Sequence, residues 1–264
     1  MSCAVHARGL THRYPGGHLA LEGIDLHIGH GERVAVLGPN GAGKTTLMLH
    51  LNGLLTATAG ALEVAGLEVC RRSLGELRAR VGLVFQDPDD QLFMPTVHED
   101  VAFGPLNMGL GRDEVAARVD EALAAVRMSD AADRAPHLLS QGQRRRVAIA
   151  TVLAMDPMLL VLDEPSANLD PRARRELVGL LAEIDRTMLI VTHDLPFAAE
   201  LCERSLILSA GRLVADAPTD EVLADDDLLA AHDLEMPAGI ALDLITRRPR
   251  PGAEAAGLSL RAGG

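Results

Sequence analysis

Eight residues from Gly38 to Thr45 have the types and spacing that bind a polyphosphate, since they fit G-x-x-x-x-G-K-[ST] at every fixed position. Glycines let backbone N–H groups turn toward an anion, and the helix expected after the loop adds its positive end. We expect Lys44 to meet the β- and γ-phosphates and the Thr45 hydroxyl to ligate Mg²⁺. An ordinary glycine-rich turn is the alternative. The predicted phosphate-binding residues are Gly38, Pro39, Asn40, Gly41, Ala42, Gly43, Lys44, Thr45 and Thr46.

A second group of candidate residues follows apolar runs that read as buried strands. Asp163 and Glu164 come directly after the aliphatic run 159–162, while Gln86 and His193 each end a further run. Ligands of open α/β sheets bind at the carboxyl ends of strands, so these side chains are expected beside the loop. Asp163 can hold Mg²⁺, Glu164 can orient or deprotonate an attacking water, and His193 can donate to a γ-phosphate. Gln86 can ligate Mg²⁺ or orient water without adding charge.

Composition limits the class of protein. Of the 264 residues, 48% are hydrophobic and only 2% aromatic, which predicts a large α/β domain with an aliphatic core. A net charge of −12 disfavours general binding to nucleic acid, because phosphate contacts need clustered cations. Three widely spaced cysteines, Cys3, Cys70 and Cys202, fit unpaired thiols better than a disulfide or a metal site. We see neither a signal peptide nor an apolar run near the ~20 residues of a spanning helix, so a partner must mediate any membrane association.

Local patterns predict where strands and helices lie. Alternating or continuous apolar runs with Gly/Pro punctuation indicate strands, and the 3.6-residue period indicates helices. The pattern changes from β-rich near the N-terminus to mainly helical between residues 87 and 155. The predicted strands are 4–14, 19–28, 33–37, 60–66, 81–85, 159–162, 187–191, and a hairpin of 205–209 with 212–215. The predicted helices are 46–51, 74–80, 96–103, 113–126, 141–155, 172–184 and 218–234, with the acidic run 225–227 expected to cap a helix start.

The helical region contains two expected caps and an apolar patch. Thr96 and Glu99 have the spacing of a capping box, and Ser140 is expected to cap the helix that ends near residue 155. A serine and a glycine amide at such a helix N-terminus form an end that binds anions. Residues 92–94 are apolar and fit either core packing or a docking surface for another protein.

Several charged or aromatic residues have two interpretations. The arginine triplet 144–146 is expected to be a solvated helix face rather than a nucleic-acid contact, given the acidic chain. Tyr14 can stack on an adenine or cap the edge of the core. Five N-terminal histidines are expected to be solvated, because no pair has the spacing of a metal site. These are His6, His12, His18, His27 and His30.

The order and spacing of the motifs resemble the ATP-binding-cassette ATPases over residues 3–234. The resemblance implies a P-loop NTPase core with an antiparallel β subdomain and an inserted α-helical subdomain at about residues 88–155. It also implies ATP and Mg²⁺ as ligands. Residues 139–143 resemble the family signature, usually L-S-G-G-Q, and residues 166–170 resemble the D-loop. The implied roles are adenine stacking for Tyr14, the Q-loop glutamine for Gln86, the Mg²⁺ ligand for Asp163, the catalytic glutamate for Glu164, the switch histidine for His193, and a D-loop role for Asp170.

The same resemblance implies two cassettes stacked head to tail, with each ATP held between one phosphate loop and the other cassette's signature. Ser140, Gln141, Gly142 and Gln143 would then act in trans. Gln141 departs from the family pattern, in which glycine is usual, so its side chain either crowds the γ-phosphate or points away.

Three segments, 86–93, 51–55 and 101–105, are similar to energy-coupling-factor importers, particularly the cobalt and nickel type. That similarity implies a transmembrane coupling protein and a substrate-capture membrane protein as partners, with this chain peripheral on the cytoplasmic face of the cell membrane. The second cassette is either a copy, giving a homodimer, or a paralogue, giving a heterodimer. A vitamin importer, a soluble cassette ATPase of DNA repair or translation, and a regulatory module without turnover are the alternatives. Residues 235–264 are expected to be a short C-terminal extension with a disordered tail from about 247.

Overall fold

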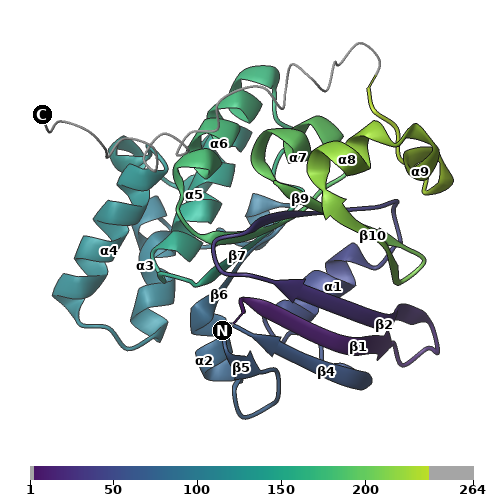
Figure 1. The fold of residues 1–264 in the computed structure, drawn as a ribbon. Coiled ribbons are helices and arrows are strands. Elements are labelled where there is room, and N and C mark those ends of the chain that lie inside the picture. Colours follow the sequence, from purple (N-terminus) through teal and green to yellow (C-terminus); the bar gives the residue numbers. More distant parts are fainter. Residues whose placement is uncertain (1–2, 238–264) are drawn as a thin grey trace, which may run out of the picture.

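The computed structural model describes residues 3–237, which form two β-sheets with helices packed around them (Figure 1). The smaller sheet has the strand order β2-β1-β4-β5, and the larger has the order β10-β9-β3-β8-β7-β6. The strands are β1 (Val5–Arg13), β2 (Leu19–Ile28), β3 (Arg33–Leu37), β4 (Ala59–Val64), β5 (Leu67–Glu68), β6 (Val81–Val84), β7 (Leu159–Asp163), β8 (Thr187–Val191), β9 (Arg204–Ser209) and β10 (Arg212–Pro218). The α-helices are α1 (Lys44–Leu51), α2 (Leu74–Arg80), α3 (Val97–Asn107), α4 (Arg112–Ala125), α5 (Gln141–Leu153), α6 (Pro171–Glu183), α7 (Leu195–Leu201), α8 (Thr219–Ala224) and α9 (Asp226–Ala231), with short 3₁₀ turns η1 (Pro88–Asp90), η2 (Ser129–Ala131) and η3 (Pro136–Leu138).

The larger sheet explains the continuous aliphatic runs of the sequence. Strands β6, β7, β8, β3 and β9 run parallel, and β10 closes one edge as the antiparallel half of the predicted hairpin. Alternate residues of β3 face opposite sides, so that Val34 and Val36 pack toward α1 and the smaller sheet while Ala35 and Leu37 pack toward the other helices. A parallel sheet covered on both faces requires apolar residues on both.

The smaller sheet and the helical region also follow the expected pattern. Strand β1 pairs antiparallel with both β2 and β4, and it ends one residue before Tyr14. Helices α3, α4 and α5 lie between β6 and β7 in the chain. The predicted capping box is confirmed, because Thr96 Oγ1 accepts from the Glu99 N–H at 3.2 Å and Glu99 Oε2 accepts from the Thr96 N–H at 3.0 Å. Cys3, Cys70 and Cys202 all lie within the described residues and form no disulfide there.

Two predicted helices differ from the structure by more than two residues at one end or in their division. The single helix predicted for 218–234 is divided into α8 and α9 at Asp225, whose carboxylate caps α9 by accepting from the Leu228 N–H at 2.9 Å. The predicted acidic cap is therefore correct, but it begins a second helix rather than the first. Helix α3 continues past Phe103 to Asn107, with Pro105 buried inside its last turn.

One of the five N-terminal histidines is buried, against the prediction of solvated side chains. His12 is only 6% exposed, and its Nδ1 lies 3.1 Å from the Thr56 carbonyl and 3.2 Å from Nε2 of the buried His50 on α1. His50 Nδ1 in turn donates to the Thr46 carbonyl at 2.7 Å. Burial lowers the pKa of His50, which favours its neutral form, and the contact between the two rings ties β1 to α1. Within residues 3–237, no group of three or more metal-ligating side chains is placed to hold a metal ion.

The C-terminal prediction falls almost wholly outside the described residues, which end at residue 237. This applies to the disordered tail predicted from about 247 and to most of the extension predicted for 235–264. The boundaries of the cassette and of its helical subdomain stay predictions. No helix in the described part of the chain is long and apolar enough to cross a membrane.

Candidate active site

Glycine shapes the loop between β3 and α1 because two neighbouring strands approach it closely. Gly38 has a φ of +145°, and a Cβ on it would lie 2.1 Å from the Leu208 carbonyl oxygen of β9. Gly43, the N-cap of α1, has a φ of +104°, and its Cβ would lie 2.5 Å from the Ala20 carbonyl oxygen of β2. No side chain fits at either position. The loop therefore leads directly into the first turn of α1, whose free N–H groups favour an anion.

Lys44 is folded back onto this loop. Its ammonium donates to the carbonyl oxygens of Gly38 at 2.7 Å and of Pro39 at 2.9 Å. Burial lowers the pKa of Lys44, while the nearby carboxylates of Glu164 and Asp163 oppose that shift. The lysine thus links the glycine loop to the acidic ends of the sheet.

Glu164 is held at a fixed position beside β8. Its backbone adopts a φ of +43°, and its N–H donates to the Val191 carbonyl at 2.8 Å. Its carboxylate accepts from His193 Nδ1 at 2.8 Å through one oxygen and from Thr192 Oγ1 at 3.1 Å through the other. A left-handed backbone at a residue other than glycine is strained and is common at functional sites. Glu164 and His193, predicted separately from two strand ends, therefore form one pair.

The charged form of Asp163 is strongly disfavoured in the folded chain. Burial, with a further contribution from Glu164, raises its pKa from 3.8 to about 6, although Lys44 and Arg145 lower it in part. Two adjacent carboxylates in a buried edge fit a hard divalent cation, which neutralises them and accepts oxygen ligands. The hydroxyl of Thr45 and the amide oxygen of Gln86 are donors of the same kind. The residues present therefore fit Mg²⁺.

A hollow of about 390 Å³ lies where these elements meet. Every predicted residue for phosphate, magnesium, adenine and catalysis lines it except Gly38 and Pro39, whose carbonyls bind Lys44 instead. The structure thus brings together three strand ends and one loop from distant parts of the chain. The lining residues are Tyr14, His18, Ala20, Asn40, Gly41, Ala42, Gly43, Lys44, Thr45, Thr46, Gln86, Asp163, Glu164 and His193.

Tyr14 lies at one end of the hollow and is tied to the phosphate loop. Its hydroxyl lies 3.2 Å from Thr46 Oγ1, and its ring meets the edge of His12 at a centroid distance of 4.7 Å. His18, which the sequence did not single out for this site, lies parallel to the Tyr14 ring at 6.5 Å. This placement favours a stacking face for a base over a cap on the core edge.

The predicted signature residues lie in a separate hollow of about 240 Å³, whose lining includes Ser140, Gly142, Gln143 and Asp170. Ser140 is the N-cap of α5 as predicted, in a capping box with Gln143. A Cβ on Gly142 would lie 2.9 Å from Ala173 Cβ, so α6 requires glycine there. Gln141 does not line this hollow. Asp170 caps α6 by accepting from the Arg172 and Ala173 N–H groups, each at 2.9 Å.

A family model described as ABC transporter matches residues 21–167, more than half of the chain, including the phosphate loop, the signature and the Asp163–Glu164 pair. The chain belongs to the ABC transporter family. Its ABC cassette is therefore an ATP-binding and ATP-hydrolysing domain. The α/β fold predicted from the motifs is confirmed.

Three relatives specify the resemblance. An ABC transporter ATP-binding protein of Streptomyces coelicolor is 63% identical over 236 residues, covering 89% of this chain and 91% of that protein. The energy-coupling factor transporter ATP-binding protein EcfA of Methanothermobacter thermautotrophicus is 46% identical, covering 95% and 81%. The cobalt import ATP-binding protein CbiO of Rhodobacter capsulatus is 47% identical, covering 95% and 91%. The predicted similarity to energy-coupling-factor ATPases of the cobalt type is confirmed.

Two solved structures have a fold similar to that of this ABC cassette. CbiO1 of Clostridium perfringens, part of the transporter complex CbiONQ, is 38% identical with a TM-score of 0.79, covering 90% of this chain and 97% of that one. A dimeric ATP-binding cassette bound to ADP and phosphate is 28% identical with a TM-score of 0.72, covering 81% and 98%. Both chains are matched over nearly their full length.

The prediction of a solvated arginine triplet is wrong for Arg145. Its side chain is 1% exposed and is the largest fully buried side chain among the residues described, while Arg144 and Arg146 are partly exposed. The three residues differ because successive helical positions point in different directions. Arg145 shares the buried face of α5 with Ala148, Ile149 and Val152. Because these three residues are apolar, the helical period of the sequence already indicates that Arg145 faces the core.

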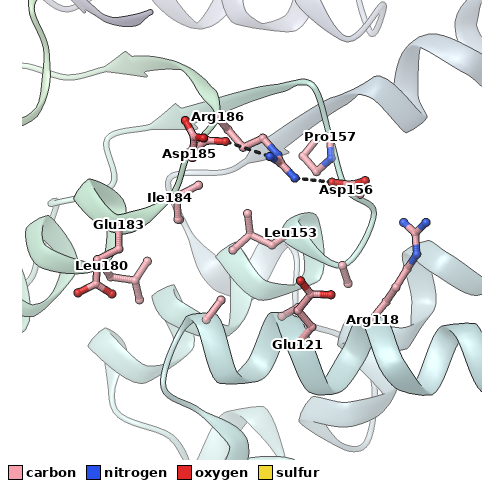
Figure 2. A pocket seen from close by; sticks show the side chains of 13 residues that line it. Arg118, Glu121, Leu153, Asp156, Pro157, Leu180, Glu183, Ile184, Asp185 and Arg186 are labelled. Atoms are coloured by element: carbon pink, nitrogen blue, oxygen red, sulfur yellow. Dashed lines mark hydrogen bonds and ion pairs between the residues drawn. The ribbon is translucent and has the colours of Figure 1, made fainter. Parts of the chain in front are cut away.

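A larger cavity, of about 630 Å³, lies away from the predicted site, between α4 and the ends of α5 and α6 (Figure 2). Figure 2 shows Arg186 reaching Asp156 across its rim, with a nitrogen–oxygen distance of 2.6 Å. None of the predicted site residues lines this cavity. Its charged residues carry both signs, among them Arg118, Glu121, Glu183 and Asp185, which gives it no single electrostatic preference.

Replacing Asp163 with asparagine is expected to make this ABC cassette more stable at pH 8. The pKa of Asp163 is about 6 in the folded chain, against the ordinary value of 3.8 in the unfolded chain, so folding favours the neutral, protonated form. The stability that this form contributes is fully present below pH 3.8 and is lost as the pH rises through 6. The two values differ by roughly two units, worth up to about 3 kcal/mol. Urea unfolding at pH 5 and pH 8, with EDTA and without nucleotide, measures the gain, which should shrink at pH 5. The exposed Asp130→Asn variant serves as the control. A pH-independent difference would contradict this origin.

Proposed function

We propose that this chain is the ATPase subunit of an energy-coupling-factor importer, which couples ATP binding and hydrolysis in a head-to-tail dimer to the uptake of cobalt or nickel ions. The observation that carries the ATPase chemistry is the Glu164 carboxylate, held between His193 and Thr192 at the rim of the 390 Å³ hollow. The names of the EcfA and CbiO relatives support the importer and its cargo.

The proposed reaction gives a role to most of the residues that line the hollow. The glycine loop and Lys44 bind the phosphates, and Tyr14 stacks on the adenine. Thr45, Gln86 and Asp163 would hold Mg²⁺, which when bound neutralises charge on the phosphate oxygens. Glu164 accepts a proton from the attacking water at its carboxylate, and His193 keeps that carboxylate in place and donates toward the γ-phosphate. Gln86 can also orient the attacking water.

The separation of the two hollows supports the dimer. Ser140 and Gly142 line a hollow that shares no residue with the one lined by Lys44 and Glu164. A capped helix N-terminus such as that of α5 favours an anion, and none of the predicted phosphate-binding residues of the same chain lies there. A second cassette, either a copy or a paralogue, would bring its nucleotide to this end. The solved cassette of similar fold that is dimeric and bound to ADP and phosphate supports a dimer.

An exposed apolar patch on α3 and the turn before it is the proposed docking surface for the transmembrane coupling protein. Phe93 is 62% exposed and meets the edge of the Phe103 ring at a centroid distance of 5.0 Å, whereas Leu92 is buried. Leu106 and Met108 extend the exposed apolar surface along α3. Of the two interpretations left open for residues 92–94, Leu92 therefore fits core packing and Phe93 fits docking. This surface would hold the chain peripherally on the cytoplasmic face, beside a substrate-capture protein.

Phe93→Asp is expected to abolish assembly with the membrane partner while leaving the intrinsic ATPase rate of the chain within about twofold, since surface changes of this kind seldom affect stability. Affinity purification of tagged chain from native membranes in mild detergent measures the yield of a small multi-spanning protein. Val214→Asp, at an exposed apolar residue on β10, is the matched control and should assemble normally. Recovery of nucleic acid or ribosomes instead of a membrane protein would favour the soluble-cassette alternative. A complex that still forms with Phe93→Asp would remove Phe93 from the docking surface.

A further inference from the structure

Arg145 connects the helix that begins at the signature to the segment that carries Gln86. It lies five residues after Ser140, one and a half turns into α5, and its guanidinium reaches the end of β6. Nη1 donates to the Phe85 carbonyl at 2.8 Å, and Nη2 donates to the Gln86 carbonyl at 2.6 Å. The fork of one guanidinium thus fixes two consecutive peptide units of the main chain.

Burying this cation is costly, which argues for a specific role. Burial lowers the pKa of Arg145, while Asp87 and Asp163 oppose the shift. The buried Nε of Arg145 has no hydrogen-bond partner, so the hydrogen bonds of this side chain are those to the two carbonyls. An apolar residue of similar length would fill the same space without desolvating a charge. What such a residue would lack is the grip on residues 85 and 86.

Gln91 provides a second, independent tie between the same two elements. Its Oε1 accepts from the Phe85 N–H at 3.2 Å. Its Nε2 donates to the Ala148 carbonyl and to Thr151 Oγ1 of α5, each at 2.8 Å. Both the N–H and the carbonyl of Phe85 are therefore bound to α5 or to a side chain anchored on it. The segment before Gln86 cannot shift without α5.

We propose that Arg145 is a positioning residue that fixes Gln86 to the helix beginning at Ser140, so that the two ATP-facing ends of one cassette respond together. Gln86 lines the hollow for the cassette's own ATP, and Ser140 lines the hollow proposed for the ATP of the second cassette. When the nucleotide of the second cassette binds at the start of α5, the placement of Gln86 beside the cassette's own ATP then changes. This inference rests on the proposed roles of Gln86 and Ser140.

Steady-state ATPase measurements on the full chain separate binding from chemistry. Arg145→Met is expected to lower kcat about 10- to 100-fold, the loss that a misplacement of about 1 Å produces, while the Kd for ATP stays within about twofold because Arg145 does not line the hollow. Arg145→Lys keeps the charge but replaces the planar guanidinium fork with a single flexible ammonium, so its kcat should lie between that of the unaltered chain and that of Arg145→Met. Arg144→Met is the matched control, because Arg144 makes only a partly exposed ion pair with Asp89 at 3.4 Å.

A double-mutant cycle with Gln86→Ala distinguishes the two possible failures. If Arg145 acts through Gln86, Arg145→Met should lower kcat by less than about twofold in the Gln86→Ala background. A wild-type kcat for Gln86→Ala alone would refute the proposed role of Gln86. A slow Gln86→Ala with additive losses, or an unchanged kcat in Arg145→Met, would refute the role of Arg145. Should the methionine variant not fold, Arg145→Lys takes its place in the cycle, and a wild-type kcat there has the same meaning.

Discussion

Replacing Glu164 with glutamine is expected to lower kcat by about 10²- to 10⁴-fold, the range for loss of a general base, while ATP still binds. Glutamine has nearly the same volume, but its amide nitrogen cannot accept a proton and meets donors where a carboxylate oxygen accepted them. Those donors are His193 Nδ1 at 2.8 Å and Thr192 Oγ1 at 3.1 Å. The phosphate loop and Lys44 are untouched, so the ATP-bound dimer should persist.

Two measurements check this result. Phosphate release gives kcat, and size-exclusion chromatography with and without ATP gives the fraction of dimer. Glu183→Gln is the matched control, because Glu183 makes an exposed ion pair with Arg127 and lines the 630 Å³ cavity rather than the hollow of the proposed site. Steady hydrolysis by Glu164→Gln would remove Glu164 from the mechanism. Tight ATP binding without any dimer would leave the base assigned and contradict the head-to-tail assembly.

Replacing Lys44 with alanine is expected to weaken ATP binding itself by at least about 30-fold, or about 2 kcal/mol, the lower range for charged hydrogen bonds. The change removes a cation that donates hydrogen bonds to the glycine loop, and it frees the Gly38 and Pro39 carbonyls that Lys44 holds at 2.7 and 2.9 Å. It also leaves Asp163 and Glu164 without their nearest positive neighbour from α1. Both effects oppose a polyphosphate.

Isothermal titration calorimetry with ATP gives the Kd, and circular dichroism verifies the fold. Arg118→Ala removes a cation from α4, where Arg118 pairs with Glu114, and should leave the Kd unchanged. An ATP affinity for Lys44→Ala equal to that of the unaltered chain would contradict the assignment of the loop. Loss of binding together with loss of the folded state would instead mean that Lys44 stabilises the loop.

The strands and the residues at their ends could be predicted because each strand is a short aliphatic run followed at once by a polar residue. Asp163 ends β7, and Thr192 and His193 follow β8, so a parallel sheet places both ends at one edge. The break at Asp225 could not be placed in the same way, since one acidic run can cap either of two successive helices. Only the packing of α8 and α9 decides between them.

Two buried polar residues contradict the sequence prediction. Their residue type favours the solvent, whereas their position in the strand or helix favours the core. His12 lies two residues after the buried Leu10 on β1, and the period of two puts both on the inner face. Arg145 lies on the buried face of α5 for the corresponding reason in a helix. In each case the partner is a group that a sequence does not reveal, either a histidine on α1 or two main-chain carbonyls.

The hollow that holds Lys44 and Tyr14 has a practical consequence. Lys44 is the only lysine of the 264 residues, Tyr14 is the only tyrosine, and there is no tryptophan. A reagent selective for lysine side chains can therefore react at one place, the phosphate loop, where the lowered pKa leaves more of the amine unprotonated. Tyrosine fluorescence likewise arises from one ring, which lies where the base is proposed to stack. The chain thus carries a single lysine side chain and a single tyrosine ring, both inside the site they would report on.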